Sequence, residues 1–295
     1  MRIKDSGLDR YKTQRNLQLT GGRSIAWYEW GEATGTPLIF CTGAAMSGCM
    51  GFGANAIREL GVRLISIDRP GLGQSTNDPE KTFASWAEDV REILVAENLL
   101  GTEVGAVGFS QGGPFALALA AAGIVNAVAL VSAQDELGHP SVRSAVAGEV
   151  VAMLDAVNDD PDQFEEHFRS FATADGLWDL IVSMSHPHDR KYYEEPTFAA
   201  AYQQALTSGF SQGPQGYVRD LVIAMAPWPF LIDDLLTPID LWYGGLDTST
   251  VHSPDHGESL ASRIRHSRRV LRPDEGGSLL WTNAREILAG VLRSM

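Results

Sequence analysis

The chain has 295 residues, of which 44% are hydrophobic and 20% charged, and its formal net charge is −14 at pH 7. This composition is ordinary for a globular protein, and the length suits one large domain that carries an insertion. The negative charge disfavours nucleic acids and anionic membranes as partners, because phosphate binding requires clustered lysines and arginines.

Strand patterns alternate with helix patterns in the first half of the chain. This alternation is typical of a mostly parallel sheet with helices on both faces. One helix has a clear start signal, because apolar residues at helical spacing follow Thr82, a residue type that caps helices. The predicted strands cover residues 24–30, 37–41, 63–67, 103–109 and 127–131, and the predicted helices cover 52–60, 83–99 and 112–122.

The pattern changes between residues 139 and 235, where strand signals nearly disappear and helical stretches dominate. We predict helices over residues 144–157, 161–171, 198–207 and 217–226. The alternation then resumes, with strands at 239–243 and 269–271 and helices at 255–264 and 281–292. We therefore expect a core domain built from residues 1–138 and 236–295, with a helical cap, residues 139–235, inserted over the end of the sheet.

The five residues Gly108-Phe109-Ser110-Gln111-Gly112 join a buried strand directly to a small-residue helix. A residue at such a junction takes a strained conformation that raises its side chain above the sheet edge, and the flanking glycines leave room for the turn. The amino end of the following helix points N–H groups at the same place. Ser110 is therefore the candidate nucleophile.

The turn after an earlier strand, around Thr42-Gly43-Ala44, is the candidate partner of this junction. Acyl transfer needs two N–H donors aimed at the developing oxyanion. We expect these donors to be the N–H groups of Ala44 and Gln111. A third turn, Asp68 to Ser75, lacks the glycine pattern of a dinucleotide site and reads as a rigid structural turn beneath the site.

Four blocks, PLIFCTGAA, GVRLISIDRPGLGQST, VGAVGFSQGGPFALALA and DLWYGGLDTSTV, occur in the order and spacing of the α/β-hydrolase superfamily. The chain resembles this group, which contains esterases, lipases, lactonases and proline iminopeptidases. The resemblance implies the α/β-hydrolase fold and a catalytic triad in the chain order serine, acid, histidine. It places the acid at Asp247, after the strand IDLWY, with Asp135 as a lesser candidate.

The resemblance fails at the histidine, which should follow the last strand. The segment there reads RPDEGGSLLW, and Ser278 stands at the expected position. A serine hydroxyl does not titrate near neutral pH, and losing the base of a triad typically costs several orders of magnitude in rate.

Three explanations stay open for the missing base. Another histidine can supply it, and His252 is the strongest candidate ahead of His139 and His256, whereas His186 and His188 are expected on the surface of the insertion. Alternatively, Ser278 replaces a histidine to trap a bound substrate. In the third explanation, the protein is a non-hydrolytic relative that keeps the pocket for binding, or for a cyclase or lyase step.

The expected substrate is a small apolar ester, lactone or amide, because aromatic residues are frequent in the insertion and caps of this kind exclude water. We expect no metal and no cofactor. The two cysteines, Cys41 and Cys49, suggest a reducing compartment, and residues 1–14 contain no apolar run typical of a signal peptide. We therefore predict a cytoplasmic protein with a small-molecule partner, and leave a homodimer open.

Overall fold

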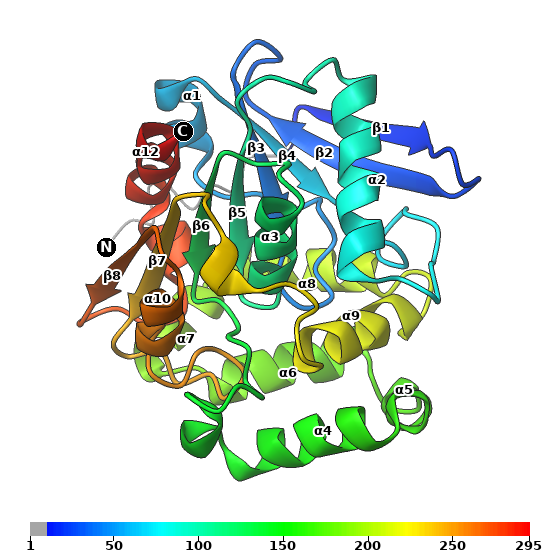
Figure 1. Ribbon diagram of the computed structural model, residues 1–295, viewed down its shortest axis with the longest axis vertical. Helices are drawn as coiled ribbons and strands as arrows, with labels where there is room; N and C mark the ends of the chain where they lie inside the picture. Colours follow the sequence, from blue (N-terminus) through cyan, green and yellow to red (C-terminus); the bar gives the residue numbers. More distant parts are fainter. Residues whose placement is uncertain (1–10) are drawn as a thin grey trace.

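A computed structural model describes residues 11–295, so the first ten residues of the polar segment 1–14 lie outside the described part. Its centre is an eight-stranded sheet with the order β1-β2-β4-β3-β5-β6-β7-β8 (Figure 1). The pairs β1–β2 and β2–β4 are antiparallel, and the remaining neighbours are parallel. The strands are β1 (Thr13–Gln18), β2 (Ser24–Trp30), β3 (Thr36–Cys41), β4 (Val62–Ile67), β5 (Gly105–Phe109), β6 (Ala127–Val131), β7 (Ile239–Gly244) and β8 (Ser267–Arg272).

The central strands are buried on both faces of the sheet, which explains why they appear in the sequence as continuous apolar runs. In β3, Ile39 and Cys41 belong to the hydrophobic cluster on one face, whereas Leu38 and Phe40 belong to the cluster on the other. Successive side chains of a strand point to opposite faces, so one apolar run supplies two cores.

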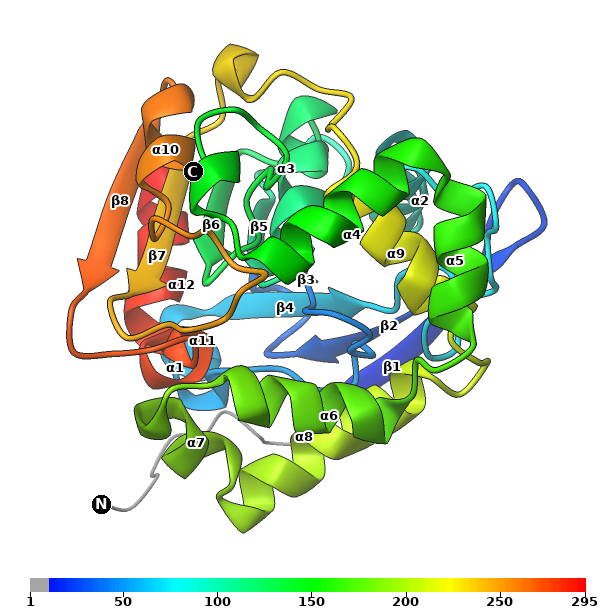
Figure 2. The same cartoon turned by 90° about the horizontal axis from the view of Figure 1, so that it is seen from below.

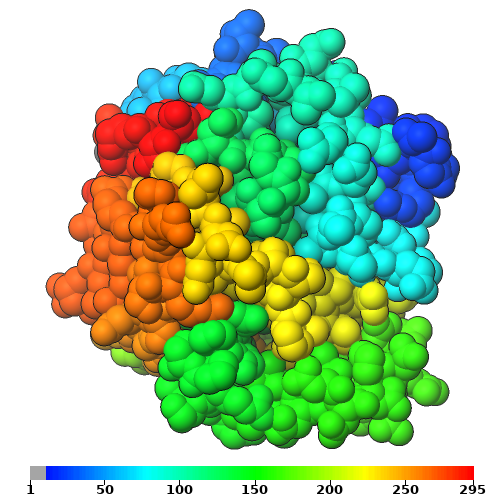
Figure 3. Space-filling view, in the orientation of Figure 1, coloured from blue at the N-terminus to red at the C-terminus, as the bar shows by residue number. Residues whose placement is uncertain are grey.

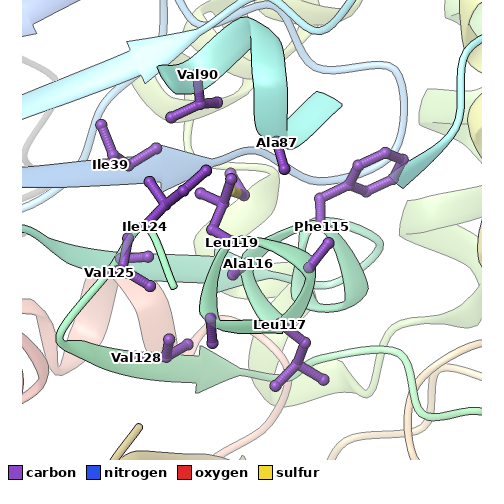
Figure 4. Packing of buried hydrophobic residues seen from close by; sticks show 14 of the residues in the cluster. Ile39, Ala87, Val90, Phe115, Ala116, Leu117, Leu119, Ile124, Val125 and Val128 are labelled. Carbon is purple, nitrogen blue, oxygen red and sulfur yellow. The ribbon is translucent and has the colours of Figure 1, made fainter. Parts of the chain in front are cut away.

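Helices cover both faces of the sheet. The first face is packed by α2 and α3, whose apolar side chains interlock with those of β3 and β6 (Figure 4). The Thr82 hydroxyl accepts a hydrogen bond from Ser85 N, and Ser85 Oγ accepts one from Thr82 N, so the predicted N-cap of α2 forms a full capping box. The flanking helices are α1 (Ala54–Leu60), α2 (Phe83–Ala96), α3 (Gly112–Ala121), α10 (Glu258–Arg263), α11 (Leu279–Thr282) and α12 (Ala284–Ser294).

The chain between β6 and β7 contains helices and loops but no strand, and we call it the insertion. Its helices lie together at one end of the sheet, and α4 and α6 run as two separate bars across that end (Figures 1 and 2). The first part of the insertion packs against the loop that follows β7 (Figure 3). Its elements are η1 (Arg143–Ala145), α4 (Gly148–Asp159), α5 (Pro161–Arg169), α6 (Ala174–Met184), α7 (Pro187–Tyr193), α8 (Pro196–Gly209), α9 (Gln215–Met225) and η2 (Ile232–Asp234).

The predicted fold class, an α/β-hydrolase fold with an inserted helical region, is confirmed. The domain limits at residues 138/139 and 235/236 stay a prediction. The sequence patterns missed β1, a polar strand paired on one side only, and the helices α6 and α7. Among residues 11–295, no helix is long and apolar enough to cross a membrane.

Candidate active site

Ser110 stands at the turn between β5 and α3, where the sequence places it. Its φ is +50°, a left-handed conformation that L-residues rarely adopt. The turn leaves no space for side chains at its glycines: a Cβ on Gly112 would lie 2.0 Å from Cys41 O. The strained residue is locked by two backbone hydrogen bonds, Ser110 N to Val131 O and Gln134 N to Ser110 O. The backbone around Ser110 is therefore held by the neighbouring strand β6 and the loop that follows it.

The structure brings His252 to the nucleophile. Its Nε2 lies 2.9 Å from Ser110 Oγ, and its Nδ1 lies 2.7 Å from Asp247 Oδ2. The side chain of His252 is 11% exposed, so it does not face the solvent as a histidine in a polar loop usually does. Serine, histidine and carboxylate thus form one continuous chain of hydrogen bonds, with the geometry of a catalytic triad.

The loop after β7 folds back on itself to place this ring. Ser249 N donates to Asp247 Oδ1, which closes a tight turn directly after the acid. Four residues later the chain is held by the loop that follows β6, because Ser253 N donates to Ala133 O and Ser253 Oγ contacts Asp135 Oδ2 at 3.0 Å. The four residues between acid and histidine therefore carry His252 over the end of β6.

The environment of Asp247 favours its charged form. Burial alone raises the pKa of this carboxyl group, but the charge and hydrogen bond of His252, together with the N–H of Ser249, outweigh burial and lower the pKa below its ordinary value of 3.8. An ionised Asp247 holds the Nδ1 proton of His252, which leaves Nε2 free to accept the Ser110 proton.

The two predicted oxyanion donors border the same pocket as Ser110. Gln111 is the N-cap of α3, and Ala44 lies in the turn after β3, where Ala45 also has a positive φ of 52°. The Thr42 hydroxyl donates to Met46 O at 2.7 Å and tightens this turn. Ala44 and Gln111 thus border the space above Ser110, and their role as oxyanion donors stays a prediction.

A pocket of about 330 Å³ opens above Ser110 between the core and the insertion. Its lining is mainly apolar, and its volume suits a small organic molecule. Among the insertion aromatics that we considered for this role, Phe168, Tyr193 and Tyr202 line it. Sequence reasoning did not single out Gln134, Tyr217 or Asp189, which line it as well, because nothing in their local sequence distinguishes them. Within residues 11–295, no group of three or more His, Cys, Asp or Glu side chains could hold a metal ion.

Comparison with known proteins gives the family. A family model described as the alpha/beta hydrolase fold matches residues 36–284. The chain belongs to the α/β-hydrolase fold family. A search of curated protein sequences found no match.

Solved structures of this family are similar over nearly the whole chain. A bromoperoxidase from Bacillus anthracis is 20% identical with a TM-score of 0.71, and the match covers 95% of this chain and 100% of the other. An esterase from a Rhodococcus species is 23% identical with a TM-score of 0.64, over 95% and 98% of the two chains. The enol-lactonase from Burkholderia xenovorans is 19% identical with a TM-score of 0.67, over 95% and 99%. At these identities the likeness shows a shared fold.

This α/β-hydrolase departs from the expected arrangement at Ser278. The resemblance assigned that position to the triad, but its hydroxyl donates to Asp189 Oδ1 at 2.7 Å, and its N–H donates to the same oxygen. Gly277 N donates to Asp189 Oδ2, so one carboxylate of α7 accepts three hydrogen bonds from this turn. Ser278 is thus an anchor between the core and the insertion, and the structure brings His252, not residue 278, to Ser110.

The other candidates lie elsewhere. His139 Nδ1 contacts Ser141 Oγ at 2.7 Å, and His256 lies beyond Ser253 with a φ of +53°. His186 and His188 are the N-cap and the second residue of α7, and the exposed side chain of His188 agrees with its expected place on the surface. Asp135 contacts Ser253, the residue after His252, and does not stand in the acid position that Asp247 occupies.

Proposed function

We propose that this protein is a serine hydrolase that cleaves an ester, lactone or amide bond of a small apolar substrate. The observation that carries the proposal is the chain of two hydrogen bonds from Ser110 Oγ through His252 to Asp247. The apolar pocket above Ser110 and the family membership support the substrate class and the fold, respectively.

The proposed reaction proceeds by acyl transfer. His252 Nε2 takes the proton of Ser110 as its oxygen attacks the substrate carbonyl, and Asp247 stabilises the imidazolium that forms. The N–H groups of Ala44 and Gln111 bind the oxyanion. His252 then gives its proton to the leaving group, and a water molecule, activated by the same imidazole, releases the acyl group from Ser110.

Labelling of the nucleophile tests the proposal directly. The purified protein is treated with a fluorophosphonate, which modifies activated serines, and the labelled peptide is identified by mass spectrometry. We expect label on Ser110, loss of labelling in Ser110→Ala, and turnover of short-chain p-nitrophenyl esters by the unmodified protein. A protein that binds these esters without labelling or turnover would instead be a binding module, and the proposal would be wrong.

A further inference from the structure

A buried ionic cluster lies behind the turn after β3. Arg69, which follows β4, and Asp220, on α9 of the insertion, both have fully buried side chains, and Arg69 Nε lies 2.7 Å from Asp220 Oδ2. Lys81 Nζ lies 2.5 Å from the other oxygen of Asp220 and is also fully buried. Burying three charges is costly unless each is paired and hydrogen-bonded. A cluster of this kind, with no part in the proton transfers described above, calls for a specific role.

The hydrogen bonds of the two terminal nitrogens of the Arg69 guanidinium indicate that role. Nη1 donates to Thr42 O at 2.6 Å, and Nη2 donates to Gly43 O at 3.0 Å. These carbonyls belong to the turn that holds Ala44. The guanidinium is further fixed by the ring of Phe115, whose centroid lies 4.7 Å from Arg69 Cζ.

Peptide geometry connects this contact to the reacting centre. Gly43 C=O and Ala44 N–H belong to one peptide unit, which is trans because the described chain has no cis bond. In a trans peptide the C=O and N–H bonds point in opposite directions. A cation that holds the Gly43 oxygen from behind therefore aims the Ala44 N–H toward the pocket. It also polarises the peptide, which makes this N–H a stronger donor.

We propose that Arg69 is a positioning residue for the oxyanion site: it orients and polarises the Gly43–Ala44 peptide, and Asp220 of the insertion fixes Arg69 for this task. The inference rests on the proposed hydrolase function. It makes the rate of acylation depend on contact between α9 and the turn after β3, although neither Arg69 nor Asp220 lines the pocket.

The test compares Arg69→Gln and Arg69→Lys with a matched control, Arg63→Gln. Arg63 is also buried, belongs to β4 itself, and pairs with Glu29 at 2.9 Å, but it lies at the opposite end of that strand. For each protein we would measure kcat and KM with p-nitrophenyl butyrate, the rate of fluorophosphonate labelling, and the melting temperature.

We expect Arg69→Gln to lower kcat and the labelling rate roughly 10- to 100-fold while KM changes less than about threefold, since loss of one oxyanion donor typically costs 10²–10³ in kcat. Arg69→Lys keeps the positive charge but loses the two-pronged guanidinium. Its kcat and labelling rate should lie between those of Arg69→Gln and the unmodified protein. Arg63→Gln should melt earlier with kcat unchanged. If Arg69→Gln does not fold, Arg69→Lys alone decides.

A folded Arg69 variant whose kcat matches that of Arg63→Gln would overturn the inference, and so would a rise in KM at constant kcat. A second measurement replaces Ala44 by lactic acid, which turns the amide into an ester and removes the N–H. If Arg69 acts through this N–H, Arg69→Lys should cost little further rate in the ester protein, and a full additive loss contradicts the inference. Absence of labelling in the unmodified protein would overturn the proposed function itself, and the inference with it.

Discussion

At the scale of single residues, the site depends on a histidine that follows its acid by five positions. The imidazole of His252 lies within hydrogen-bond distance of both the Ser110 hydroxyl and the Asp247 carboxylate. Ser278 has a full set of partners of its own on Asp189, so no replaced histidine is needed to explain the turn around it. The structure thus favours the first of the three explanations considered for the missing base.

Removal of the histidine at position 252 and introduction of one at position 278 test the assignment of His252 as the base. We expect His252→Ala to lower kcat by roughly 10³- to 10⁴-fold, because removal of a triad member typically has this effect. Ser278→His should give no gain, in the unmodified protein or in His252→Ala, since residue 278 is 1% exposed and its side chain is directed to Asp189 Oδ1. Ser278→Ala is the control and should keep most activity. A large gain on Ser278→His would show that position 278 belongs to the base after all.

Asp135 supplies a pH-dependent prediction. Ser253 Oγ accepts a hydrogen bond from Gly257 N and lies 3.0 Å from both Asp135 and Asp255. Burial raises the pKa of Asp135 from 3.8 to about 6, despite its hydrogen bonds to Ser253 and Glu136 N, whereas the hydrogen bonds of Asp255 outweigh its burial and lower its pKa. Asp135 is therefore the carboxyl group of this pair that takes up a proton first as the pH falls.

Because the folded state binds this proton more tightly than the unfolded chain, the stability that Asp135 contributes is present below about pH 4 and is lost as the pH rises to about 6. The loss amounts to roughly 2–3 kcal/mol. Asp135→Asn mimics the protonated form and removes the titration. In urea unfolding from pH 4 to pH 7, the stability of the unmodified protein relative to Asp135→Asn should fall by that amount. A constant difference between the two proteins would contradict the assignment.

At the scale of elements, α7 fastens the insertion to the turn before α11. The carboxylate of Asp189 is 2% exposed and accepts hydrogen bonds from Gly277 N, Ser278 N and Ser278 Oγ. A Cβ on Gly276 would lie 1.9 Å from the same carboxylate, which explains the glycine there. The turn is thus held at the edge of the pocket, next to Asp247.

Removal of this carboxylate should destabilise the fold through the groups that it leaves unpaired. We expect Asp189→Ala to lower the free energy of unfolding by about 2–4 kcal/mol, because buried donors without partners are costly. His188→Ala on the same helix is the control, since that side chain is 44% exposed and its loss should change stability by less than about 0.5 kcal/mol. Urea unfolding measures both variants. Asp189→Ala and Ser278→Ala should be less than additive, and strict additivity would show that the two residues act independently.

At the scale of the whole molecule, the pocket lies between two bodies of structure that meet at one end of the sheet. The core supplies the reacting groups, and the insertion supplies most of the apolar lining, including Phe168, Leu177 and Tyr202. The net charge of −14 surrounds this site with a negative field. For the proposed hydrolase we therefore expect substrate selection to combine an apolar pocket with long-range repulsion of anions.

Salt dependence tests the long-range component. We expect kcat/KM for an anionic ester, such as a p-nitrophenyl hemisuccinate, to rise several-fold between about 0.01 M and 0.15 M salt, because the screening length falls from about 30 Å to about 8 Å. The value for a neutral butyrate ester of the same alcohol should stay constant, which controls for general effects of salt. Equal salt responses of the two esters would show that the net charge does not select substrates.

The sequence by itself determined those features of this protein that depend only on a short stretch of neighbouring residues. Apolar runs and helical periodicity predicted most elements of the core, Thr82 predicted a helix start, and the glycine-flanked turn predicted the place of Ser110. These features follow from backbone sterics and the burial of nearby residues, so a short window contains them. The polar edge strand β1 and the helices α6 and α7 lack such a signal.

Only the tertiary structure decided which histidine meets the nucleophile. His252 and Ser110 are 142 positions apart, and no motif relates them. The ring reaches Ser110 because Ser253 is bonded to Ala133 and Asp135 at the end of β6, the strand beside β5. The hydroxyl of Ser278 instead donates to Asp189, which lies in the insertion. Such contacts between distant segments are set by the packing of the whole chain, which local patterns do not record.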